Sequence, residues 1–269
     1  MKYKIFTSKP KCVWKSNNIL GEGTVWVKEL NSVFFVDIKK KKIFSFNIYN
    51  KKKKIINLNK QIGFLAHISK SIFILGLEDE LRVVNLKSGK IINSIPIEKN
   101  IPNNRINDGK IDTIGRLWFG TMDNKERSIK TGSLYCLDEN LNLHKVDSNY
   151  IVPNGPAFID AKNFYHTDSR KKTIYKIRVN KSFKITKKKI FLKFNSNDGS
   201  PDGMTIDSNK NLWVCHFHGA CISVFNKFGK KIHQIGFDAK NITNCTFAGK
   251  NNDKLFISSA TKSMTKSEL

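Results

Sequence analysis

The sequence has no long hydrophobic run and no helical periodicity. Its apolar stretches fall well short of the roughly eighteen residues that a membrane-spanning helix requires. No segment repeats apolar residues at the spacing of an amphipathic helix, which argues against an α/β fold. Residues 1–15 lack an apolar core followed by a small-residue cleavage site, so no secretory signal is expected. The sequence therefore predicts a soluble, cytoplasmic protein.

Cysteine and proline are also scarce, with five and six residues respectively. The cysteines lie far apart and form no CxxC pair, the spacing that zinc sites and redox motifs use. Reduced thiols are expected, because disulfides are rare in cytosolic proteins.

Acidic residues are few: 22 Asp and Glu stand against 48 Lys and Arg, which gives a net charge of +26. A charge of this size is typical of proteins that bind nucleic acids or anionic surfaces. Most of the cations, however, are lysines in short runs between apolar segments, such as 39–42, 51–54 and 187–189. This distribution favours a solvated surface, so neither nucleic acid nor membrane is predicted as a partner. The pattern specifies no oligomeric state.

A short apolar strand with an aromatic residue near its start recurs six times. The aromatic residues are separated by 39, 45, 46, 49 and 43 positions, and they are Phe34, Phe73, Trp118, Phe164, Trp213 and Phe256. These steps match the length of a four-stranded propeller blade. We therefore predict an all-β, six-bladed β-propeller that forms a single domain over residues 1–269. Only thirteen residues follow Phe256, so the last blade is expected to be incomplete, with Lys4–Ser8 and Cys12–Lys15 as candidate N-terminal strands.

Polar residues recur ten to twelve positions before four of these aromatics, on the innermost strand of each predicted blade. They are Glu22, Asn107, Asn154 and Asp202, each in or next to a glycine-containing turn sequence. The other two blades carry Ile62 or Gly63 and Cys245 at this position. Equivalent positions form a ring around a propeller axis, and buried carboxylates need a counter-ion. Oxygen donors of this kind favour Ca²⁺, Mg²⁺ or Mn²⁺; the alternative is that these sequences only build hairpin turns.

Arg105 lies two residues before Asn107 and should share its side of the sheet. From there its guanidinium could hold substrate hydroxyl or carboxylate oxygens.

These motifs resemble the gluconolactonase and regucalcin family of sugar lactonases, also called senescence-marker-like proteins. The segments that carry the resemblance span most of the chain; they are Leu20–Gly23, Arg105–Asp112, Gly115–Met122, Asn154–Pro156 and Pro201–Asp207. The resemblance implies that Glu22, Asn154 and Asp202 bind one divalent cation, which is Ca²⁺, Mg²⁺, Mn²⁺ or Zn²⁺. It also implies that Arg105 and Asn107 contact a small-molecule sugar lactone, and that Asp202 is the catalytic acid/base. The reaction would be metal-dependent hydrolysis to the aldonic acid.

The alternatives are a calcium-binding, regucalcin-like regulatory protein without turnover and a propeller that serves as an interaction platform. Within the lactonase interpretation, the substrate and the physiological ion stay open. Members of the family often carry an acidic substrate contact shortly after Gly-Thr-Met. Here that stretch reads Asp123-Asn124-Lys125-Glu126, which offers two candidates.

Overall fold

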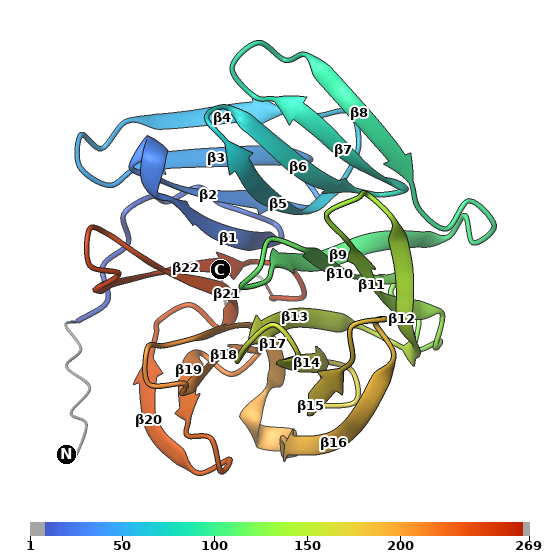
Figure 1. Ribbon diagram of the computed structural model, residues 1–269. Helices are drawn as coiled ribbons and strands as arrows, with labels where there is room; N and C mark the ends of the chain where they lie inside the picture. The colour runs from blue at the N-terminus through green and yellow to red at the C-terminus, as the bar shows by residue number, and fades with distance from the viewer. Residues whose placement is uncertain (1–8, 266–269) are drawn as a thin grey trace.

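The computed structural model describes residues 9–265 and consists almost wholly of β-strands (Figure 1). Two short 3₁₀ helices, η1 (Lys28–Leu30) and η2 (Ser196–Asp198), are the only helical elements in this range. No helix within it is long and apolar enough to cross a membrane. The strands form five four-stranded antiparallel sheets and one two-stranded sheet.

Each four-stranded sheet is a propeller blade whose strands follow in sequence order. Blade 1 contains β1 (Gly21–Val27), β2 (Ser32–Asp37), β3 (Lys42–Asn47) and β4 (Lys53–Asn57). Blade 2 contains β5 (Ile62–Ser69), β6 (Ile72–Leu77), β7 (Glu80–Asn85) and β8 (Ile91–Pro96). Blade 3 contains β9 (Asn104–Ile111), β10 (Leu117–Asp123), β11 (Gly132–Leu137) and β12 (Leu143–Tyr150).

The remaining sheets continue this order. Blade 4 contains β13 (Pro153–Phe158), β14 (Asn163–Asp168), β15 (Thr173–Val179) and β16 (Ile185–Lys193). Blade 5 contains β17 (Ser200–Ile206), β18 (Leu212–Phe217), β19 (Cys221–Phe225) and β20 (Lys231–Gly236). The last sheet contains only β21 (Asn241–Ala248) and β22 (Lys254–Ala260).

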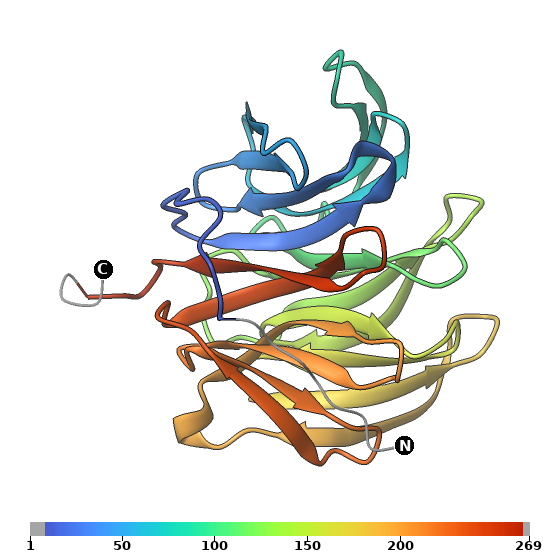
Figure 2. The same ribbon diagram turned by 90° about the vertical axis from the view of Figure 1, so that its left-hand side faces the viewer.

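The all-β propeller is confirmed, whereas the prediction of six blades requires correction. Residues 9–265 form five complete blades, and the sixth repeat supplies only β21 and β22. This pair lies between blade 1 and blade 5 in both views (Figures 1 and 2). The innermost strands β1, β5, β9, β13, β17 and β21 contact one another in that order, and β21 returns to β1. The two-stranded sheet therefore closes the ring.

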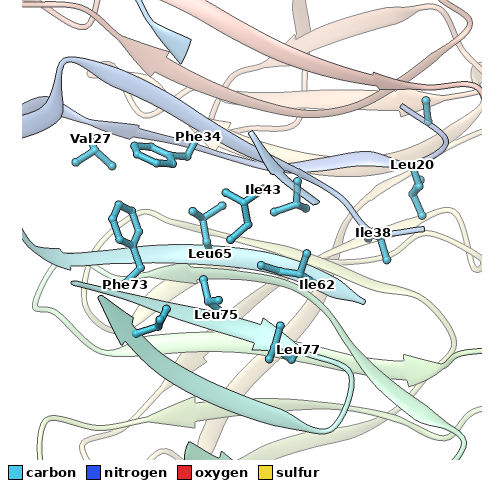
Figure 3. Packing of buried hydrophobic residues seen from close by; sticks show 13 residues of the cluster. Leu20, Val27, Phe34, Ile38, Ile43, Ile62, Leu65, Phe73, Leu75 and Leu77 are labelled. Carbon is cyan, nitrogen blue, oxygen red and sulfur yellow. The ribbon is translucent and has the colours of Figure 1, made fainter. Parts of the chain in front are cut away.

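Apolar side chains fill the space between neighbouring sheets, as the aromatic repeat predicts. Between blades 1 and 2, Phe34 packs on Phe73 with ring centroids 4.9 Å apart, and Leu65 and Leu75 complete the contact (Figure 3). Similar apolar clusters lie between each further pair of neighbouring sheets around the ring. Burial of these side chains stabilises the fold by roughly 25 cal/mol per Å² removed from water.

The expected N-terminal strands do not complete the last sheet within the described residues. Cys12–Lys15 forms no strand, and Lys4–Ser8 lies outside the described residues. Instead of pairing through its backbone, the segment is anchored by Trp14, which packs edge-on against Phe35 and Phe44 of blade 1 at 5.7 and 5.3 Å. All five cysteines are free thiols.

Candidate metal and substrate site

A β-bulge interrupts every innermost strand near its first residues. The irregularities lie between Glu22 and Val25, Ile62 and Phe64, Ile106 and Gly109, Asn154 and Ala157, Pro201 and Met204, and Ile242 and Asn244. A bulge places two residues opposite one on the partner strand and changes the direction in which a side chain points. Polar side chains on these strands can therefore turn toward the axis of the ring even where simple alternation would direct them elsewhere.

The structure brings the four predicted ring residues to one end of the propeller. Glu22, Asn107, Asn154 and Asp202 are all more than nine-tenths buried. The Nδ2 of Asn107 donates to Oδ1 of Asn154 at 3.0 Å. The charge of Glu22 acts directly on Asp202, although these residues come from blades 1 and 5. The four side chains converge because each lies near the beginning of the innermost strand of its own blade, and these strands surround the axis.

Asn107 orients both of its polar neighbours. Its Oδ1 accepts a hydrogen bond of 2.7 Å from Nη1 of Arg105, and its Nδ2 also donates to the carbonyl of Pro153 at 2.8 Å. Asn154 is held from its other side, because its Nδ2 donates to Oγ of Ser169 at 2.8 Å. Asn154 thereby presents its Oδ1 to the site. Arg105 lies on the same side of the sheet as Asn107, as the alternation of side chains predicts.

Two further residues belong to this site and were missed by the sequence analysis. Asp108 is 3% exposed and accepts hydrogen bonds from the backbone N–H groups of Gly109 and Gly155, both at 2.9 Å. Asn244 donates to Asp108 at 3.4 Å and accepts from Thr24 at 2.9 Å. The spacing of the repeat predicts Cys245 at this position in the last blade. The bulge shifts the register by one residue, so that Asn244 faces the carboxylates instead.

Burial and mutual repulsion disfavour ionisation of the three carboxyl groups. Burial, together with repulsion from the neighbouring Asp108, raises the pKa of Glu22 to about 8. Burial likewise raises the pKa of Asp202 well above its ordinary value, with added repulsion from Glu22 and then Asp108. The pKa of Asp108 is also raised by burial, although Lys110 and two backbone N–H groups oppose the shift.

A divalent cation fits this donor set because it would compensate buried negative charge with oxygen ligands. No group of three or more His, Cys, Asp or Glu side chains in residues 9–265 is arranged as a metal site. A cation would therefore need the amide oxygen of Asn154 together with the carboxylates of Glu22 and Asp202.

At the rim of the site the acidic residue Glu126 is surrounded by cations. Its carboxylate lies 3.8 Å from Nη2 of Arg105 and 3.4 Å from Nζ of Lys39, and it accepts a hydrogen bond from Lys262. Asp123, the other candidate after Gly-Thr-Met, is paired with Arg127 at 2.7 Å instead. Of these two acidic residues, Glu126 is the one that the structure places against Arg105.

These features define a β-propeller with a buried carboxylate and amide centre at one end of its axis. Residues 20–261 match the SMP-30/gluconolactonase/LRE-like family, and the chain belongs to that family.

Known relatives agree with this assignment. A putative sugar lactone lactonase of Bacillus subtilis is 32% identical, with 93% of this chain and 86% of that protein covered. Regucalcin of Sus scrofa is 29% identical, with coverages of 94% and 87%. The crystal structure of a calcium-binding protein, regucalcin, from Agrobacterium tumefaciens has a TM-score of 0.89 at 22% identity, with coverages of 95% and 87%, which supports the fold.

Proposed function

We propose that this protein hydrolyses a sugar lactone to the corresponding aldonic acid, with one divalent cation bound by Glu22, Asn154 and Asp202. The observation that carries the proposal is the convergence of buried carboxylates from three blades beside the guanidinium of Arg105. A site that only stored a cation would not require a buried arginine held 2.7 Å from Asn107. Membership of the gluconolactonase-like family supports the same reaction class.

Each residue of the site has a distinct role in this proposal. When bound, the cation would polarise the lactone carbonyl as a Lewis acid. Asp202 takes a proton from the attacking water and returns one to the ring oxygen when the acyl carbon–oxygen bond breaks. Arg105 holds hydroxyl oxygens of the sugar through its N–H groups. Asn107 positions Arg105 and Asn154, and no Ser or Cys nucleophile is required.

The test is proton release from a panel of five- and six-carbon aldonolactones, after EDTA treatment and after return of Ca²⁺, Mg²⁺, Mn²⁺ or Zn²⁺. We expect turnover that depends on the metal and falls at least 10³-fold in Asp202→Ala, which loses both a ligand and the base. Asp253→Ala is the matched control, because this carboxylate is 56% exposed in the turn between β21 and β22. A folded protein that binds a cation tightly but hydrolyses no lactone would contradict the proposal and favour a calcium-binding role.

A further inference from the structure

We propose that the lactone carries an anionic group, a phosphate or a carboxylate, which binds to Lys39, Lys262 and Arg105 at the rim of the site. This inference rests on the proposed lactonase function and specifies its substrate class. The three cations come from three different sheets and meet around the single carboxylate of Glu126.

The topology explains why these residues meet. Lys39 follows β2, Glu126 follows β10 and Lys262 follows β22, so each comes directly after the second strand of its sheet. The end of that second strand pairs with the start of the innermost strand, as Gly21 opposite Asp37 shows in blade 1. The cluster therefore lies at the same end of the propeller as the carboxylate and amide centre.

Arg105 connects the rim to the centre. One guanidinium nitrogen donates to Asn107 in the ring, and the other lies 3.8 Å from Glu126 at the rim. The charge of Lys262 also acts on Asp202, which places that lysine near the proposed base. A sugar lactone whose carbonyl lies at the centre can therefore extend its remote carbons toward the cations.

The cluster contains more positive charge than its own carboxylate can balance. Three cationic groups share Glu126, and the Nε of the 2%-exposed Arg105 has no hydrogen-bond partner among residues 9–265. Burial and then the neighbouring guanidinium lower the pKa of Lys39, as expected where cations are crowded. Glu22 and Glu78 also act on the charge of Arg105, but from outside the cluster. A phosphate or carboxylate of the substrate would accept charge-assisted hydrogen bonds directly from the three cations, whereas a neutral sugar offers them only weaker, uncharged acceptors.

The experiment compares D-glucono-1,5-lactone with its 6-phosphate and with D-glucaro-1,4-lactone, which carries a carboxylate. We expect kcat/KM of the metal-loaded protein to be at least tenfold higher for one of the charged lactones than for the neutral one. The preferred lactone shows whether the anionic group is a phosphate or a carboxylate. Lys39→Gln or Lys262→Gln should lower that preference about tenfold each, since each removes a charge-assisted hydrogen bond. Glu126→Gln should increase it by removing a competing anion.

Lys41→Gln is the matched control, because it changes the same charge in the same loop while its Nζ contacts the carbonyl of Asn59. Equal kcat/KM for neutral and charged lactones, unaltered by Lys39→Gln, would overturn the inference and leave the lactonase standing. If no lactone is hydrolysed, calorimetric binding of gluconate and 6-phosphogluconate or glucarate decides. If 6-phosphogluconate or glucarate binds tenfold more tightly than gluconate, and Lys39→Gln removes this difference, the anion site is supported although the lactonase proposal has failed. Equal affinities for the three acids would reject both the anion site and the lactonase proposal.

Discussion

The stability of the metal-free protein should fall as the pH rises, because the site contains carboxyl groups that resist ionisation. The pKa of Glu22 is about 8 in the folded state and 4.5 in the unfolded chain. Between these values the folded state retains a proton that the unfolded state loses. Each pH unit in this window therefore lowers the free energy of unfolding by up to about 1.4 kcal/mol for this residue alone. The loss from pH 5 to pH 8 amounts to a few kcal/mol, on the order of 4.

A bound divalent cation should remove most of this loss, because it stabilises the ionised carboxylates in the folded state alone. The assay is denaturant unfolding in EDTA at pH 5 and pH 8, repeated with each of the four cations. The metal-dependent gain should be large at pH 8 and small at pH 5, where protons occupy the ligands.

Glu22→Gln isolates this effect from other titrating groups. The variant keeps the size of the side chain but cannot ionise, so it should lose both the pH dependence due to Glu22 and most of the metal-dependent gain. The comparison is needed because buried His166, whose pKa burial lowers to about 4, makes stability rise with pH up to its ordinary value of 6.5. If wild type and Glu22→Gln show the same slope between pH 5 and pH 8, the account of the carboxylates is wrong.

Two further substitutions test the geometry of the site. Asn107→Ala should lower kcat/KM for a lactone about 100-fold, because it frees Arg105 from its 2.7 Å hydrogen bond. The free energy of unfolding should fall by less than the roughly 2.7 kcal/mol to which this loss of kcat/KM corresponds. Wild-type kcat/KM in the variant would show that the hydrogen bond does not position Arg105 for the reaction. Gly63→Ala should destabilise the protein by about 3 kcal/mol in denaturant unfolding, because the added Cβ would lie 1.9 Å from the carbonyl oxygen of Asn107. Wild-type stability in that variant would contradict the close approach of blades 2 and 3.

The sequence contains enough periodicity to predict the blades, and too little to predict how the site is filled. The six aromatic residues do occupy the second strand of each sheet, because their spacing reflects blade length. Bulges, by contrast, leave no simple mark in a pattern of alternating residues. Asp108 follows Asn107 directly, and strict alternation would direct it away from the axis. The same one-residue shift makes Asn244, rather than Cys245, the polar contact of the last sheet.

The repeat in the sequence also does not predict which loops contact one another. Lys39 and Lys262 stand in stretches rich in lysine and look like ordinary surface charge. Only the closed ring brings them to Glu126, since the three residues are far apart in the chain and their loops meet through the topology of separate sheets.

Ring closure and the candidate site depend on the same hydrogen bonds. Within residues 9–265 the last sheet has two strands, so it offers blade 1 less apolar contact than a complete blade would. Besides the apolar contact of Phe256 with Phe46, polar hydrogen bonds attach it at the level of the site. Thr243 donates to the carbonyl of Gly21, and Thr24 donates to Asn244. Asn244 in turn donates to Asp108, which also accepts from the N–H of Gly155 in blade 4. Ionisation of the carboxylates without a cation therefore strains the same network that holds the first and last sheets together, and binding of a cation at the centre should tighten the closure of the ring.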